Sequence, residues 1–277
     1  MASAIACTNP PEGRSCWTMQ MIADKLVELK YVTDITDETV RFRLKKKEIK
    51  PWQHEQWCIP EITAEFICCM EDILDLYERG YDFKYPIVCL DEKPYQLLKD
   101  VFSPLLPKQG QPWREYYTYE RSGTCNLFVI FCLGLGWRHI EVTGQRTAVD
   151  YAKILKKIVD EYFPQAERIL VVQDNLNTHN GASLYKAFEP EEAFRIHKKL
   201  EFHYTPVHAS WLNMAEIEIH VLGKQCIDRR IGDVDILTRE IAIWETERNQ
   251  RQAKVNWQFT VDKARSKFQR SYDKLNI

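Results

Sequence analysis

Residues 168–174 read Arg-Ile-Leu-Val-Val-Gln-Asp. Four consecutive apolar residues, three of them β-branched, favour a short strand buried in a sheet. The run ends at Gln173, and Asp174 follows at once. A carboxylate beside a buried strand is expected to have a binding partner, because burying a charge without one is costly. The stretch therefore predicts a buried strand with a functional side chain at its carboxyl end.

Two further carboxylates follow or lie within apolar elements. Asp91 comes after the run Tyr-Pro-Ile-Val-Cys-Leu, and Glu216 ends the run Trp-Leu-Asn-Met-Ala-Glu. Because successive strand residues point to opposite faces, Glu92 cannot share the direction of Asp91. On a helix, Glu218 lies about 200° around the axis from Glu216, so only one of the two can point toward the aspartates. Converging carboxylates most commonly bind a divalent metal ion, and the selected set is Asp91, Asp174 and Glu216.

The order of the predicted elements indicates an α/β fold with a mixed sheet flanked by helices. Strands are predicted at 85–90, 126–135, 137–143, 168–173 and 201–204, the second and third forming a hairpin that turns at 134–136. Helices are predicted at 147–163, at 181–200 with a break at Pro190, and around Glu216. Residues 92–125, rich in Pro, Gly and Tyr, are expected to form a long connection.

This order also places the two aspartates. In open sheets flanked by helices, ligands bind at the carboxyl ends of the strands. Asp91 and Asp174 both follow a predicted strand, so neighbouring strands would bring them together. A glutamate on a buried helix nearby would complete a set of hard oxygen ligands suited to Mg²⁺ or Mn²⁺.

Composition excludes several classes of protein. Of the 277 residues, 45% are hydrophobic and 28% are charged, which is ordinary for a globular protein. No apolar run approaches the roughly 20 residues of a membrane span, and the first residues lack the layout of a secretion signal, so we expect a cytoplasmic protein without a membrane partner. Nine cysteines without a Cys-x-x-Cys pair are expected to be reduced.

A basic segment precedes the predicted sheet. Residues 41–50 hold six Lys or Arg residues against one Glu. An amphipathic helix is predicted at 17–29, and Thr36 is placed to cap a second helix that buries Val40 and Leu44. Two such helices resemble a helix-turn-helix, whose second helix enters the major groove of DNA. The candidate DNA-binding residues are Arg41, Arg43, Lys45, Lys46 and Lys47, although a merely solvated basic helix is the alternative.

The chain resembles the DDE transposases of bacterial insertion sequences in the mariner-like superfamily. The resemblance rests on three motifs in order: Cys-Leu-Asp91-Glu, Val-Val-Gln-Asp174-Asn175-Leu-Asn-Thr-His179, and Tyr-Thr-Pro-Val-His208-Ala-Ser-Trp-Leu-Asn213-Met-Ala-Glu216. It implies an RNase H-like catalytic domain in which Asp91, Asp174 and Glu216 are the catalytic residues. These three would bind two Mg²⁺ or Mn²⁺ ions in each active site.

The resemblance also implies partners and a place in the cell. Such transposases cut double-stranded DNA at the inverted-repeat ends of a mobile element and join those ends to target DNA. We therefore expect both DNAs as partners, a homodimer that pairs two ends, and a cytoplasmic, nucleoid-associated protein. Because DNA-binding helices precede the catalytic domain in this family, the resemblance favours DNA binding by the basic helix.

Other polar residues of the motifs have two interpretations. Asn175, His179, His208 and Asn213 could orient the metal ligands or contact DNA phosphates. Alternatively, the two histidines cap loops, and Asn213 starts a helix, since Asn favours helix amino-terminal positions.

Five segments are expected along the chain: a tail at 1–12, a winged-helix-like helix-turn-helix at 13–52, a connecting helix at 53–82, the catalytic domain at 83–230, and carboxy-terminal helices at 231–277 that complete it. Family members usually carry a further helix-turn-helix region ahead of Gly13, so we expect a shortened amino-terminal part. Two alternatives to a transposase stay open: a non-catalytic DNA-binding repressor or domesticated remnant, and a nuclease of the same fold that cuts without joining.

Overall fold

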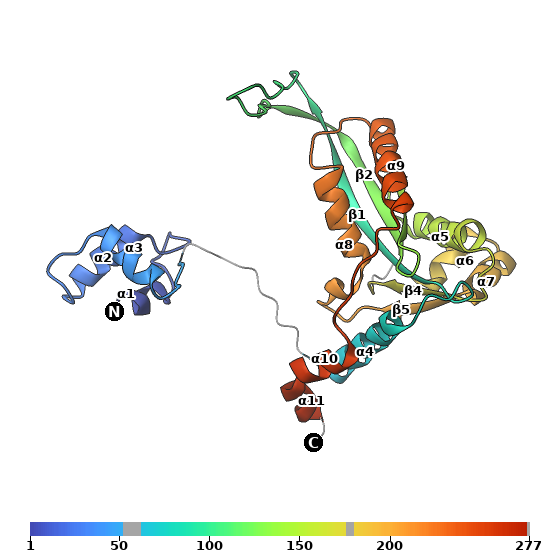
Figure 1. Cartoon of the computed structure of the whole chain (residues 1–277), viewed down its shortest axis with the longest axis horizontal. Coiled ribbons are helices and arrows are strands. Elements are labelled where there is room, and N and C mark those ends of the chain that lie inside the picture. Colours follow the sequence, from blue (N-terminus) through green and yellow to red (C-terminus); the bar gives the residue numbers. More distant parts are fainter. Residues whose placement is uncertain (52–61, 176–179, 276–277) are drawn as a thin grey trace. The chain divides into compact units, whose positions relative to one another are not determined.

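The computed structural model describes residues 1–51, 62–175 and 180–275 (Figure 1). The chain divides into two compact units, Met1–Ile59 and Pro60–Ile277, and each is described by itself. In the described ranges, no helix has both the length and the apolar character needed to cross a membrane.

The first unit is a small helical bundle. It contains α1 (Ala2–Ala6), α2 (Met19–Glu28) and α3 (Asp37–Lys45). Thr36 caps α3 by accepting a hydrogen bond from the Thr39 N–H over 3.2 Å, as predicted. The apolar stripes of the helices share one core, with the buried residues Ile5, Ala6, Trp17, Ile22, Ala23, Leu26, Val40 and Leu44. The expectation of a tail at 1–12 is corrected, because Ile5 and Ala6 add apolar surface to this core and hold α1 in place.

A five-stranded mixed sheet forms the centre of the second unit. The strands are β1 (Ile87–Asp100), β2 (Tyr119–Cys132), β3 (Trp137–Thr143), β4 (Ile169–Gln173) and β5 (Leu200–Tyr204). Their spatial order is β3-β2-β1-β4-β5. β2 runs antiparallel to both β1 and β3, whereas β4 runs parallel to both β1 and β5. The predicted mixed sheet and its hairpin are confirmed.

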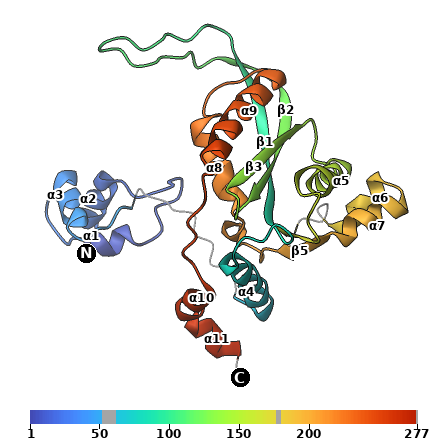
Figure 2. The same ribbon diagram turned by 45° about the vertical axis from the view of Figure 1, so that its right-hand side comes forward.

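Helices cover both faces of this sheet (Figure 2). One face packs on α5 (Ala148–Lys157), its π-helical extension Ile158–Tyr162, α6 (Leu184–Ala187) and α7 (Pro190–Lys198). The other packs on α4 (Ala64–Glu78), α8 (Ala215–Gln225), α9 (Val234–Gln250) and α10 (Val261–Lys267), and α11 (Gln269–Leu275) follows. Residues 52–61, part of the predicted connecting helix, lie outside the described residues.

The long connection expected at 92–125 is wrong. β1 and β2 pair continuously from Val88 opposite Cys132 to Asp100 opposite Tyr119, with a bulge at Leu97/Leu98. Only residues 101–118 join the two strands. The outer part of this hairpin is largely exposed, so its residues need no uninterrupted apolar run, and the sequence signal of a buried strand is missing there.

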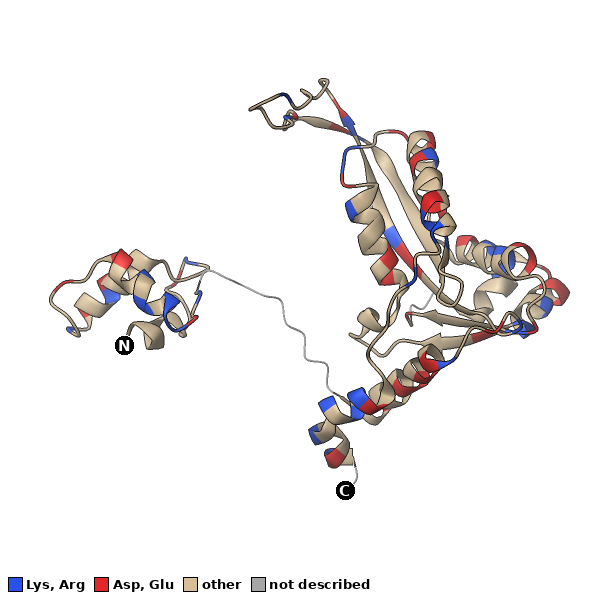
Figure 3. Ribbon diagram, viewed as in Figure 1, with Lys and Arg blue, Asp and Glu red and all other residues tan. Residues whose placement is uncertain are grey.

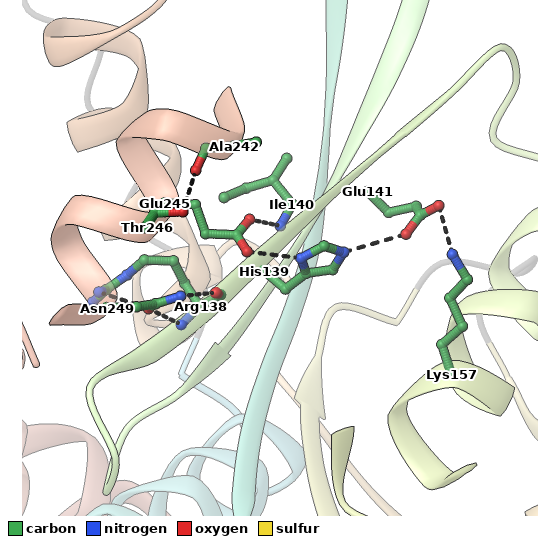
Figure 4. Close-up of polar contacts among 9 residues, drawn as sticks. All are labelled: Arg138, His139, Ile140, Glu141, Lys157, Ala242, Glu245, Thr246 and Asn249. Carbon is green, nitrogen blue, oxygen red and sulfur yellow. Dashed lines mark hydrogen bonds and ion pairs between the residues drawn. The ribbon is translucent and has the colours of Figure 1, made fainter. Parts of the chain in front are cut away.

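Helix α9 covers the free edge of β3 (Figure 4). The Arg138 N–H donates to Asn249 Oδ1 over 2.9 Å, and Asn249 Nδ2 donates back to the Arg138 carbonyl over 2.8 Å. The Ile140 N–H donates to Glu245 Oε2 over 3.0 Å. These side chains satisfy backbone groups that an edge strand would otherwise leave unpaired. Helix α9 is therefore part of the sheet's architecture.

Candidate active site

Three different elements carry the candidate carboxylates. Asp91 lies within β1, Asp174 directly follows β4, and Glu216 lies in the first turn of α8. In the parallel pair, Val88 lies opposite Val171 and Cys89 opposite Val172. Two more steps in this register bring Asp91 opposite Asp174.

The strand alternation also sets the direction of Asp91. Asp91 shares a face of β1 with Cys89, which packs in the core that contains Ala215 and Leu222 of α8. Helix α8 contacts β1. Asp91 was expected at the end of its strand, but β1 continues beyond it as the exposed hairpin. Asp91 still lies beyond Cys89, the last residue of β1 that pairs with β4.

The pKa of Asp91 depends on its burial and on the neighbouring carboxylates. Burial raises the pKa of Asp91 to about 7, although the hydrogen bond from the Glu92 N–H opposes this shift. The charges of Glu216, Glu92 and Asp174 raise the pKa of Asp91 further. The Asp91 carboxylate therefore lies in the repulsive field of its acidic neighbours.

This cluster fits a divalent cation. The donors are hard carboxylate oxygens, and a cation would relieve their mutual repulsion. Within the described ranges, no three Asp, Glu, His or Cys side chains enclose a metal position by themselves. Mg²⁺ usually keeps several waters and takes further ligands from substrate phosphates, so the carboxylates would not have to supply all of its ligands.

The two neighbouring glutamates have basic partners instead. Glu92 is 4% exposed and lies 3.6 Å from Arg146. Glu218 is 1% exposed and accepts from Arg138 Nε and from Arg248 Nη2, each over 3.0 Å. Glu216 is exposed and forms no ion pair with the residues that the structure describes. The predicted difference between the two faces of α8 is thus observed, with Glu216 available and Glu218 engaged.

Asn213 fastens the start of α8 to β1. Its Nδ2 donates to the Leu90 carbonyl over 2.9 Å, and its Oδ1 accepts from the Ala215 N–H over 3.1 Å. Asn213 is 1% exposed. One side chain therefore links the residue before Asp91 to the residue before Glu216, and the helix-start interpretation describes it better than contact with DNA.

The other polar motif residues are not brought into this cluster by a described contact. Asn175 follows Asp174 and is exposed. His208 is exposed in the loop after β5 and has a left-handed backbone, with φ of 63°. His179 lies outside the described residues.

A groove of about 440 Å³ extends from Glu216 between β1 and α8. Lys93 and Tyr95 line it from β1, and His220 and Lys224 line it from α8. On α8 the polar residues follow Glu216 at intervals of four, which places them along one stripe. Sequence reasoning missed Lys93, Tyr95 and Lys224, although the four-residue spacing after Glu216 was an available signal.

Several basic residues of the first unit gather on α3 and in the turn after it (Figure 3). Val40 and Leu44 are buried, whereas the predicted DNA-binding set is exposed: Arg41, Arg43, Lys45, Lys46 and Lys47. Arg41 is engaged with Glu38, since its Nε donates to Glu38 Oε2 over 2.7 Å. Phe42 is 68% exposed within the same surface. This surface therefore offers both cationic and aromatic groups to a partner.

Comparisons with known proteins agree with this arrangement. The family described as DDE superfamily endonuclease matches residues 86–238, which is more than half of the chain. No curated protein sequence matches the chain significantly.

Solved structures with the same fold are transposase complexes. The Mos1 mariner paired end complex with Mn has a TM-score of 0.55 and 15% identity, over 96% of this chain and 80% of that one. The pre-cleavage Mos1 transpososome gives 0.51 and 15% over the same shares, and the mariner Mos1 paired end complex with Mg gives 0.51 and 16% over 87% and 73%. At such identity the likeness shows the fold, which is the predicted RNase H-like arrangement.

Proposed function

We propose that this chain, which belongs to the DDE superfamily endonucleases, is a transposase that cuts DNA at the inverted-repeat ends of a mobile element and joins them to target DNA. The convergence of Asp91, Asp174 and Glu216 from three elements carries the proposal: the register of β1 and β4 continues to place Asp91 opposite Asp174, and Asn213 ties the start of α8 to the Leu90 carbonyl. The shared fold with Mos1 transposase, solved in a paired-end complex with its left transposon end, supports the substrate class.

The three carboxylates would hold divalent ions, Mg²⁺ or Mn²⁺, and we propose two per active site. When bound, such a pair of ions activates the attacking oxygen and stabilises the leaving oxygen of an in-line displacement at phosphorus. The chain's own task is to hold Asp91, Asp174 and Glu216 on rigid elements at one point of the sheet. Hydrolysis and strand transfer then differ only in the attacking oxygen, water or a DNA 3′-hydroxyl, so no protein nucleophile is required.

The groove beside Glu216 would guide the DNA strand. Lys93 and Lys224 can bind phosphates on either side, and Tyr95 offers a ring on which a base can stack. His220 adds a hydrogen-bond donor one turn after Glu216. A strand held along this groove would reach the carboxylates at its end.

Recognition of duplex DNA is assigned to the first unit. Its exposed basic residues on and after α3 would bind phosphates, which supplies salt-sensitive affinity without sequence information. A transposase must bring two ends together, so we propose a homodimer acting on the inverted-repeat ends and on the target. We place it with the DNA of the cytoplasm.

The test is a cleavage and strand-transfer assay. The purified chain is incubated with Mg²⁺ or Mn²⁺ and a plasmid that carries the inverted repeats flanking its own gene. We expect cuts at the repeat ends and joined products, both lost in Asp174→Ala and retained in the matched control Glu191→Ala, an exposed carboxylate on α7. Binding without any cleavage would indicate a DNA-binding repressor or remnant, and cleavage without joining would indicate a nuclease.

A further inference from the structure

A buried ion cluster connects α8 to β3 and α9. Arg138 of β3 is 0% exposed and its Nε donates to Glu218 Oε2 of α8 over 3.0 Å. Arg248 of α9 donates to the other oxygen of Glu218 over 3.0 Å. We infer that Arg138 and Glu218 are positioning residues, which fix the rotation of α8 about its axis so that Glu216 faces Asp91. This inference rests on the proposed function.

The cluster is better explained by orientation than by stability. Moving charges out of water costs several kcal/mol per ion, and well-packed apolar residues often replace a buried ion cluster without loss of stability. Beyond the hydrogen bonds of Asn213 at its start, the buried contacts of α8 through Ala215 and Leu222 are apolar and therefore non-directional. A guanidinium group, in contrast, donates in a fixed planar fork and accepts only one arrangement of its partner.

Arg138 is itself held firmly. Its Nη1 donates to Asn249 Oδ1 over 3.2 Å, and its Nη2 donates to the Ala253 carbonyl. The guanidinium carbon lies 5.3 Å from the ring centre of Phe131. Figure 4 shows Arg138 and Asn249 side by side at the junction of β3 and α9. With partners on several sides, Arg138 is a fixed reference point for α8.

The sheet fixes Arg138 relative to Asp91. Asp91 lies opposite Val129 of β2, and Val129 lies opposite Ile140 of β3. Arg138 is two residues from Ile140 and therefore on the same face of β3. The hydrogen-bonded strands connect Asp91 to Arg138, and the ion pair connects Arg138 to α8. These two links together set where α8 places Glu216.

Because of helical geometry, even a small rotation of α8 displaces the carboxylate of Glu216. Glu216 and Glu218 point about 200° apart, so fixing one fixes the direction of the other. With a helix about 10–12 Å across including side chains, a rotation of about 20° moves a carboxylate at its surface by about 2 Å. Metal–ligand distances tolerate only about 0.2 Å. A small rotation of α8 would therefore remove Glu216 from a metal site shared with Asp91.

The test measures Mn²⁺ binding directly. Glu218→Gln keeps the shape of the side chain but removes the charge that holds both arginines. We expect its Mn²⁺ affinity, measured by calorimetric titration of the full chain, to fall at least about tenfold. The Mn²⁺ concentration that half-saturates DNA cleavage should rise by a similar factor. The matched control is Glu245→Gln, which weakens the contact of α9 with His139 and Ile140 and should lower the melting temperature without changing Mn²⁺ affinity.

A second variant separates orientation from stability. Arg138→Met combined with Glu218→Met removes both buried charges, and Arg248, 20% exposed, can turn to water. We expect near wild-type stability with the same loss of Mn²⁺ affinity as in Glu218→Gln.

Three results would overturn the inference. Wild-type Mn²⁺ affinity and cleavage in these variants would do so while leaving the proposed function intact. Failure of both variants to fold would show that the fold itself requires the cluster. A wild-type chain that neither binds Mn²⁺ nor cuts DNA would overturn the proposed function, and the inference with it.

Discussion

Two groups of charged side chains lie on the α8 face of the sheet, and they differ in charge balance. The acidic cluster brings Asp91, Asp174 and Glu216 into one field, where burial and like charges raise the pKa of Asp91. The buried cluster instead surrounds Glu218 with Arg138 and Arg248. A carboxylate in apolar surroundings is thus a functional candidate when burial and neighbouring carboxylates raise its pKa, and a structural one when arginines pair with it.

The largest effect is expected from Asp91→Asn in the acidic cluster. Cleavage should fall by roughly four orders of magnitude, as for other residues at the centre of a catalytic group. In metal-free buffer the same change should raise the free energy of unfolding by about 2 kcal/mol, because it removes a negative charge that burial and the neighbouring carboxylates disfavour. Cleavage assays and urea unfolding measure the two effects.

The size of this gain depends on pH. The folded-state pKa of Asp91, about 7, lies above the ordinary value of 3.8, so the wild-type chain loses stability as pH rises from about 4 to 7. The advantage of Asp91→Asn should therefore be small near pH 4 and full above pH 7. A variant that is less stable than wild type at pH 8 would show that the charge of Asp91 does not destabilise the folded chain.

The second-largest effect is expected in the buried cluster, where Arg138 and Arg248 bind Glu218. Glu218→Ala leaves Arg138 buried without its carboxylate, and we expect the free energy of unfolding to fall by about 3–5 kcal/mol. Glu216→Ala, two residues earlier on the exposed face of the same helix, should leave stability almost unchanged while abolishing cleavage. Urea unfolding of the two variants provides the comparison. Equal losses of stability would erase the distinction between the clusters.

The acidic cluster could be predicted from the sequence better than the buried cluster around Glu218. Asp174 follows an uninterrupted apolar strand, and helical geometry separates Glu216 from Glu218 without any structure. The partner of Glu218 could not be predicted, because Arg138 lies 80 positions away in the sequence and reads as an ordinary charge in an alternating strand. Long-range pairing depends on how β3, α8 and α9 pack, and no local pattern encodes it.

The elements of the fold likewise divide into those that a local sequence signal predicts and those that it does not. The buried strand at 169–173 and the hairpin turn before Trp137 have local signals, and both are observed. The outer parts of β1 and β2 were missed, because mutual pairing, rather than burial, holds these exposed strands. Helix α1 was missed as well, since five residues carry too little periodicity to stand out.

A third network, where β3 meets α9 and α5, should show an intermediate effect. Burial opposes a charge on His139, but its bonds with Glu141 and Glu245 raise the pKa of His139 to about 9, and Lys157 also binds Glu141. The stabilisation is full below about pH 6.5 and is lost as pH rises through 9. We expect a loss of about 2 kcal/mol across that interval.

His139→Gln tests this effect, with Glu191→Ala as a control that leaves the network intact. The difference in the free energy of unfolding between wild type and His139→Gln should shrink as pH rises from 6.5 to 10, because both chains then lack the charged imidazole. Parallel curves would show that His139 is not held in its charged form by the two glutamates.

The smallest effect is expected in the groove that leaves the acidic cluster. Lys93→Ala and Lys224→Ala should each weaken binding of single-stranded DNA a few fold and reduce the slope of log affinity against log salt by about 0.7, the value of one phosphate contact. Lys224 lies 3.6 Å from Asp228, but both side chains are largely exposed, so this pair offsets little of its charge. The matched control is Lys153→Ala, an exposed lysine of α5 on the other face of the sheet. If all three variants changed the slope equally, the lysines of the groove would act only through net charge, and the acidic cluster would lack a dedicated path for its strand.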